Sequence, residues 1–247
     1  MVAQIDLVTV HEAILISPAC LYSYDDSDAL EVYANHRGRF GLVRPFNPKS
    51  ETVGEEVEEW AATPGVVGAR IMLRPYAFTE SHPGLSSILD AGAEAGIPIN
   101  IMCSGNLDLF GQLADKHPNT QMVIDHLGIP QPHLPPVPEN PFADLDKVIS
   151  LAKHDNVVIK ISGAGTLSHE SFPYADIWEP LGKIFNAFGL DRCLWGTDWT
   201  RAVELLTYKE GVEAFRVTDS LSDSEREILM GGSLSKIYKW EIGRAHV

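Results

Sequence analysis

Short apolar runs recur along the chain, and longer segments with a helical alternation of apolar and polar residues separate them. Nearly continuous apolar character is typical of strands that are covered on both faces. Strands that alternate with helices predict an α/β fold around a parallel sheet. Seven runs are predicted as strands: AILIS (13–17), FGLVRPF (40–46), GARIML (68–73), IPINIM (97–102), QMVIDH (121–126), VVIKIS (157–162) and CLWGTD (193–198).

Helices are expected between these strands, and several carry start or stop signals. Gly96 and the pair His117-Pro118 should end two of them, and Ser222 with Glu225 forms a capping box for a final helix. A proline-rich stretch at 130–141 is predicted to be a stiff loop that forms an active-site wall. The predicted helices are 28–35, 52–62, 85–95, 107–116, 142–154, 178–187 and 202–216.

The length of 247 residues and the 45% hydrophobic content match a single α/β barrel, so one domain is expected over residues 1–240. Seven strands are one fewer than a TIM-like (β/α)8 barrel has, and IDLVTVHE at the start resembles a helix. We therefore expect the first strand to be missing and the two sheet edges to be exposed, which favours a piece of a longer protein. The last residues, EIGRAHV (241–247), lack apolar periodicity, and their reverse translation resembles a sequencing adapter, so a non-native tail is predicted.

The chain is strongly acidic, with a formal net charge of −15. This charge opposes binding to nucleic acids and to anionic membranes, and it favours a small-molecule substrate, with oligomerisation left open. Cys20, Cys103 and Cys193 have no metal-binding spacing and indicate buried thiols in a reducing compartment. No basic region followed by an apolar run precedes the first strand. A cytoplasmic location is predicted.

Two strand ends carry groups that can do chemistry. In VIDHLG, His126 follows an apolar strand, and in LWGTDW, Asp198 ends the last strand. Carboxyl ends of barrel strands face the active site. Each residue has a structural alternative, because His126 could bind a loop carbonyl and Asp198 could cap the next helix. Together they offer the proton acceptor and the polarising group that hydrolysis needs, so both are predicted to be catalytic.

Three further residues are predicted to bind substrate. Arg74, at the end of its strand, could hold a substrate carboxylate in bidentate fashion, or it could instead pair with Glu80 or Asp108. For Arg70, earlier in the same strand, a structural role is favoured over substrate binding. Ser104 could donate a hydrogen bond to a substrate, but its sequence is equally typical of an ordinary turn. Lys160 lies inside an apolar strand and is expected to be paired.

Five motifs in order resemble the amidohydrolase-related family, in the branch of lactonases and metal-dependent decarboxylases: TPGVVGARIML, HPNTQMVIDHLGIP, VVIKISG, CLWGTDW and LSDSEREILMGGSLSKIYKW. The resemblance covers most of the chain and implies a TIM-like barrel with His126 and Asp198 in the active site. In metal-binding members, these two residues join a His-x-His of the first strand around zinc or a similar divalent ion. No His-x-His occurs in this sequence. The motifs most resemble the branch similar to pyrone-dicarboxylate lactonase, which implies that a metal-free mechanism is credible beside a single divalent metal.

The resemblance and the residues together predict a hydrolase of small carboxylated cyclic esters, or of related C–O or C–N bonds. Asp198 would activate water, His126 would polarise the substrate, and Arg74 would hold a carboxylate. Two alternatives remain. One is a metal-dependent decarboxylase of a small organic acid, and the other is an inactive fragment or a binding module.

Overall fold

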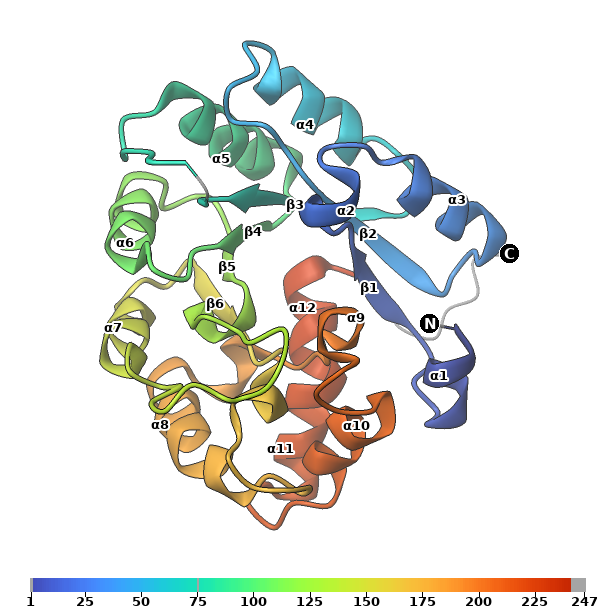
Figure 1. Cartoon of the computed structure of the whole chain (residues 1–247). Helices are drawn as coiled ribbons and strands as arrows, with labels where there is room; N and C mark the ends of the chain where they lie inside the picture. Colours follow the sequence, from blue (N-terminus) through green and yellow to red (C-terminus); the bar gives the residue numbers. More distant parts are fainter. Residues whose placement is uncertain (1, 75, 241–247) are drawn as a thin grey trace. The chain divides into compact units, whose positions relative to one another are not determined.

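The computed structural model describes residues 2–74 and 76–240, and it contains a seven-stranded sheet in which the strands follow one another in chain order (Figure 1). The pairs β1–β2, β2–β3, β3–β4 and β6–β7 are parallel. The strands are β1 (Ala13–Ile16), β2 (Phe40–Pro45), β3 (Val66–Met72), β4 (Ile99–Met102), β5 (Met122–Ile124), β6 (Val157–Lys160) and β7 (Cys193–Leu194). The predicted α/β class is confirmed, and each predicted strand is present.

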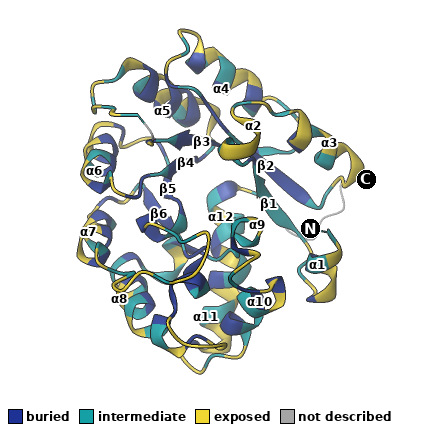
Figure 2. Cartoon of the chain, viewed as in Figure 1, coloured by how far each residue is buried: buried dark blue, intermediate teal, exposed yellow. Residues whose placement is uncertain are grey.

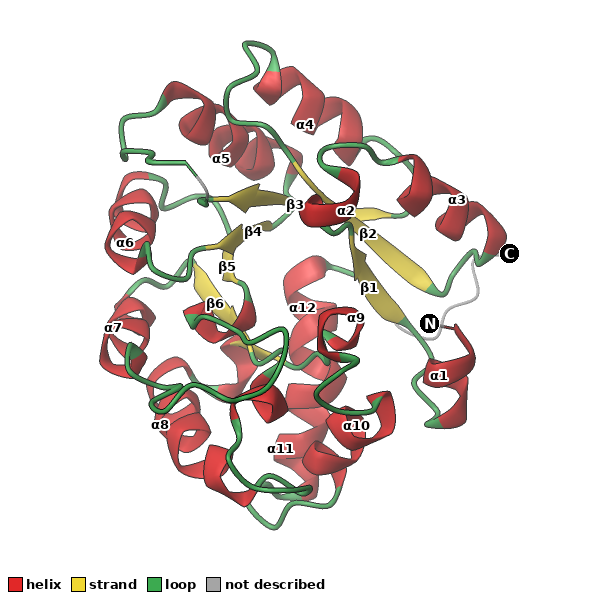
Figure 3. Cartoon of the chain, viewed as in Figure 1, coloured by secondary structure: helices red, strands yellow, loops and turns green. Residues whose placement is uncertain are grey.

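The helices alternate with the strands along the chain (Figure 3). They are α1 (Val2–Leu7), α2 (Ala19–Tyr22), α3 (Ser27–Asn35), α4 (Val53–Ala61), α5 (Pro83–Ala95), α6 (Leu107–Lys116), α7 (Leu145–Ser150), α8 (Trp178–Phe188), α9 (Trp199–Ala202), α10 (Tyr208–Arg216), α11 (Asp223–Glu227) and α12 (Ser233–Tyr238). No helix in the described ranges is long and apolar enough to cross a membrane.

The chain divides into two compact units. Within the described residues, the first unit comprises 2–10, 124–153 and 158–234, and the second comprises 11–74, 76–123, 154–157 and 235–240. The tail predicted at 241–247 lies outside the described residues.

The second unit contains β1 to β4, with α4 and α5 side by side against β3 (Figure 1). Strand β3 is almost wholly buried, whereas all four residues of β1 are half-buried, as expected at the edge of a sheet (Figure 2). Trp60 on α4 donates from Nε1 to the Gly68 carbonyl at 3.0 Å and thereby holds α4 to β3. Helix α5 ends at Ala95, and Gly96 is its C-cap with a left-handed φ of 69°, so the predicted helix stop at Gly96 is confirmed.

The first unit contains β7 and the helices around it. Strand β7 has only two residues, and both are buried, which differs from the expected exposed edge. The backbone of Trp195, just after β7, donates to the Leu229 carbonyl at 3.1 Å, so a turn of the C-terminal segment covers this end of the strand. Ser222 and Glu225 form the predicted capping box at α11.

One predicted helix was wrong. The segment 202–216 was expected to be continuous, but α9 ends at Ala202 and α10 begins at Tyr208. The cause is a second capping box, in which Thr207 and Glu210 satisfy each other's backbone N–H groups and start a new helix. Most strands end earlier than predicted. Because β5 ends at Ile124 and β7 at Leu194, neither contains its candidate catalytic residue.

Candidate functional site

His126 and Asp198 both lie in the first unit, just after β5 and β7, in strained backbone conformations. His126 has a φ of 49° and Asp198 a φ of 51°, in the left-handed region that non-glycine residues rarely adopt. Such a conformation destabilises the folded state by about 1–3 kcal/mol for each residue, and it persists where the surrounding structure holds it, often at functional sites. Leu127 and Gly128 share the left-handed conformation, so the chain turns sharply directly after β5 and orients the His126 side chain.

The structure brings the two candidate catalytic side chains together. His126 Nδ1 lies 3.4 Å from Asp198 Oδ2 and 2.9 Å from Ser162 Oγ. The side chains of His126 and Asp198 are 15% and 16% exposed, so the pair is largely shielded but keeps some contact with solvent. Three neighbouring strand ends, those of β5, β6 and β7, supply the three residues, because parallel strands end on the same side of a sheet.

Arg201 joins this pair, and the sequence interpretation missed it. Its Nε donates to Asp198 Oδ2 at 2.5 Å, and its side chain is 13% exposed. The guanidinium also donates to the Pro132 carbonyl, to Gln131 Oε1 at 3.3 Å and to Thr166 Oγ1 at 3.2 Å. The available signal was the spacing of Asp198 and Arg201, which lie three residues apart at the start of a helix and can therefore pair.

The structural alternative for Asp198 was the N-cap of the next helix. Asp198 does occupy the N-cap position of α9, but its side chain makes no capping hydrogen bond. It pairs instead with His126 and Arg201.

The predicted pairing of Lys160 is confirmed. Its Nζ lies 3.1 Å from Oδ1 of Asp125, the residue next to His126, and the Asp125 side chain is only 1% exposed. This buried ion pair links the end of β6 to the turn that carries His126.

The three predicted substrate-binding residues lie in the second unit, whereas the pair lies in the first. Arg70 is buried within β3, opposite Asn100 of β4, which suits the structural role considered for it. Arg74 is exposed after β3, and a Cβ at Gly105 would come within 2.2 Å of its Nη2, so the guanidinium lies against the loop after β4. Ser104 is buried next to that glycine.

Within the described residues, Arg74 forms no ion pair with either carboxylate that was considered for it, Glu80 or Asp108. The roles of Arg70, Arg74 and Ser104 in substrate binding stay predictions.

A metal was predicted as an option, with His126 and Asp198 as ligands. Catalytic zinc usually has three protein ligands. In the part of the chain that the structure describes, no group of three or more His, Cys, Asp or Glu side chains could hold a metal ion. Asp198 Oδ2 is bound by the Arg201 guanidinium, whose positive charge repels a divalent cation. The described residues therefore do not fit a catalytic zinc site.

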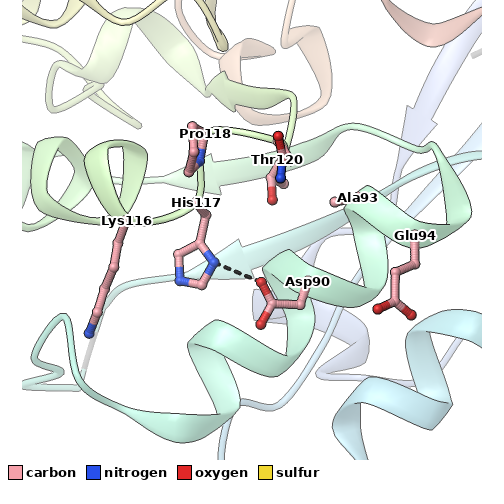
Figure 4. Close-up of a pocket in the computed structure, with 8 residues that line it drawn as sticks. Asp90, Ala93, Glu94, Lys116, His117, Pro118 and Thr120 are labelled. Atoms are coloured by element: carbon pink, nitrogen blue, oxygen red, sulfur yellow. Dashed lines mark hydrogen bonds and ion pairs between the residues drawn. The ribbon is translucent and has the colours of Figure 1, made fainter.

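A separate pocket of the second unit lies beside α5 and the end of α6 (Figure 4). His117 Nδ1 lies 2.9 Å from Asp90 Oδ1, and His117 Nε2 lies 3.2 Å from Ser86 Oγ. The three side chains are thus connected as in a Ser-His-Asp triad. The Ser86 backbone N–H is bonded to the His82 carbonyl, so it is not available to stabilise an oxyanion. Ser86 is also not among the residues that line the pocket: Asp90, Ala93, Glu94, Lys116, His117, Pro118, Asn119 and Thr120. We assign His117 the structural role of tying α5 to α6.

Comparison with known proteins places these features in context. A family model described as amidohydrolase matches residues 8–239. The chain is 36% identical over 80 residues to 4-sulfomuconolactone hydrolase of Rhizobium radiobacter, across 32% of this chain and 25% of that protein. It is 28% identical over 158 residues to L-fucono-1,5-lactonase of Burkholderia ambifaria, across 61% of this chain and 52% of that protein. The chain thus matches only a quarter to about half of these relatives' lengths.

Solved structures agree on the fold. An amidohydrolase from Burkholderia multivorans with bound zinc has a TM-score of 0.78 at 21% identity, covering 96% of this chain and 86% of that chain. A putative 2-pyrone-4,6-dicarboxylic acid hydrolase from Pseudomonas putida has a TM-score of 0.76 at 21% identity, covering 97% and 86%. The predicted TIM-like fold is therefore confirmed.

Proposed function

Because the chain belongs to the amidohydrolase family, whose model matches residues 8–239, we propose that it hydrolyses a small cyclic ester that carries a carboxylate. Three of the similar proteins are named as hydrolases of lactones or of a pyrone dicarboxylic acid, which supports a lactone as the substrate class. The single observation that carries the proposal is the contact of His126 with Asp198 at 3.4 Å, made by two strained residues from different strand ends.

Asp198 is assigned as the base that activates water. Within the described residues, its contacts with His126 and Arg201 both use Oδ2, so Oδ1 is the oxygen that we assign to the water molecule. Water attacks the ester carbonyl carbon while its proton passes to Asp198. The bond to the ring oxygen then breaks, and the same proton passes to that oxygen, so the products are a hydroxy acid and the regenerated carboxylate.

His126 is assigned to the carbonyl oxygen of the ester. The imidazole lies beside the carboxylate and can donate a hydrogen bond as negative charge develops on that oxygen. The hydroxyl of Ser162, 2.9 Å from Nδ1, fixes the orientation of the ring. Arg74 remains our proposal for binding the substrate carboxylate, because it is an exposed arginine directly after β3.

The test is lactone hydrolysis by the purified chain and by the variants Asp198→Asn and His126→Gln. A general base typically contributes about 100-fold to 10,000-fold, so we expect kcat/KM to fall at least about 100-fold in Asp198→Asn. The control is Asp223→Asn, which removes a fully exposed carboxylate that also pairs with an arginine three residues away. Equal activity of Asp198→Asn and Asp223→Asn would refute the assigned base.

A metal-dependent decarboxylase of a small organic acid is the alternative with different chemistry, in which a divalent metal would polarise the substrate. His126 and Asp198 are only two candidate metal ligands, and Asp198 is already bound to Arg201, so the site does not favour the decarboxylase. One equivalent of zinc or manganese in the purified protein, measured by elemental analysis, together with loss of carbon dioxide from a small organic acid, would support the decarboxylase instead.

A further inference from the structure

Arg201 lies where the loops after three strands meet. It binds Asp198 after β7, the Pro132 carbonyl and Gln131 Oε1 after β5, and Thr166 Oγ1 after β6. One guanidinium thus binds four groups that are up to 70 residues away in sequence. Its planar fork of donors suits several acceptors in fixed directions, which a single ammonium group cannot match.

The backbone leaves room for this guanidinium at Gly163. Gly163 has a φ of 77°, and a Cβ there would lie 2.9 Å from Arg201 Nη2 and 2.6 Å from Gln131 Oε1. Any larger residue at 163 would displace either the arginine or the glutamine. The glycine after β6 therefore forms a cradle for the contact between Arg201 and Gln131.

Gln131 and Pro132 belong to a long irregular segment, residues 129–144, which we call the wall loop (Figure 3). Gln131 also donates from Nε2 to the backbone carbonyl of His126 at 3.2 Å. Farther along the loop, side chains such as Leu134 are exposed. The contacts of Gln131 and Pro132 with Arg201 and His126 thus hold the start of the wall loop against the candidate site.

We propose that Arg201 is a positioning residue that holds the Asp198 carboxylate and the wall loop in one arrangement. The inference rests on the proposed function for its kinetic part, because Asp198 is the assigned base. Arg201 fixes Oδ2 and leaves Oδ1 for water, and the same guanidinium keeps the wall loop beside the pair. Substrate would meet a base and a loop whose positions are set by one cation.

The test compares Arg201→Lys with Arg226→Lys. Arg226 is a matched control in the same unit, since it also binds a carboxylate three residues away and three backbone carbonyls, those of Phe215, Thr218 and Leu221. We expect Arg201→Lys to raise amide hydrogen exchange in 129–144 at least tenfold and to lower kcat at least tenfold. Arg226→Lys should change neither, although both variants keep the charge.

A double variant separates positioning from general loosening. If Arg201 acts through Asp198, then Arg201→Lys placed on Asp198→Asn lowers kcat little further, whereas a purely structural effect multiplies the two losses. Multiplied losses, or unchanged exchange in 129–144, would overturn the proposal. Gln131→Ala is the second variant if Arg201→Lys fails to fold, and it should release the wall loop while Asp198 keeps its arginine.

The two proposals fail in different ways. If the wild-type chain opens no lactone, the proposed function is wrong, and hydrogen exchange in 129–144 then decides alone whether Arg201 holds the wall loop. If the wild-type chain is active but Arg201→Lys matches Arg226→Lys in both readouts, only the role of Arg201 is wrong.

Discussion

Replacement of Lys160 by methionine should destabilise the first unit far more than an ordinary surface change. Asp125 is only 1% exposed and Lys160 only 13%, with 3.1 Å between Nζ and Oδ1. Loss of one partner from a buried ion pair costs about 3–5 kcal/mol, because a charge stays behind in a poorly solvated place. Since Lys160 keeps some contact with water, we expect a loss near the lower limit, about 3 kcal/mol in the free energy of unfolding.

Urea unfolding followed by circular dichroism measures this loss. With a slope of about 3 kcal/mol per molar, 3 kcal/mol moves the midpoint by about 1 M urea. Lys147→Met is the control, because Lys147 is 61% exposed and 3.7 Å from Asp144, a surface pair worth at most about 1 kcal/mol.

The double variant Asp125→Asn with Lys160→Met tests the cause. It removes both charges, so most of the lost stability should return, within about 1 kcal/mol of the wild type. A single Lys160→Met variant that unfolds at the same urea concentration as Lys147→Met would show that this pair does not hold the turn before His126. A double variant as unstable as the single one would show that the loss comes from packing and not from the charge left on Asp125.

Two further predictions concern titration. Burial raises the pKa of the Cys193 thiol to about 12, and Cys103 is buried as well. A thiol reagent at pH 8 should therefore label only the exposed Cys20 until denaturant is added. Rapid labelling of two or more thiols in the native protein would contradict this prediction. Burial also raises the pKa of Tyr208 to about 12 from 10.0, so the stabilisation that the neutral phenol gives the folded state is complete below pH 10 and is lost as pH rises through 12. The free energy of unfolding should therefore depend less steeply on pH between pH 9 and 12 in Tyr208→Phe than in the wild type, and an unchanged slope would refute this prediction.

The fold was predictable because apolar runs mark strands directly. Each predicted strand is present, since strands such as β2 and β3 are buried along most of their length and therefore need continuous apolar sequence. The break between α9 and α10 was missed because the apolar spacing of 202–216 continues across it. Thr207 and Glu210 were the correct signal, because the hydrogen bonds of their capping box, and not the apolar periodicity, determine where α10 begins.

The contact between His126 and Asp198 was also within reach of the sequence, because both follow apolar runs that end on the same side of a parallel sheet. The pairing of Arg201 with Asp198 could have been inferred from their spacing of three residues. The contacts of Arg201 with Gln131 and Pro132 could not, since these residues lie 70 and 69 positions away in a loop without periodicity. The cradle at Gly163 was hidden for the same reason. A glycine in VVIKISG predicts a turn, but only the fold shows what occupies the space beside it.

The backbone strain at His126 and Asp198 means that the charged residues around them are needed to hold both residues in their left-handed conformations. Two left-handed residues together cost about 2–6 kcal/mol and relax unless contacts on several sides hold them. Ser162 and the pair of Asp125 with Lys160 hold the His126 turn, and Arg201 holds Asp198. Because each strained residue also contacts the other, loosening either ion pair should disturb both side chains. The cation beside Asp198 therefore supports the backbone as well as the carboxylate, and a bound metal would have to replace both effects.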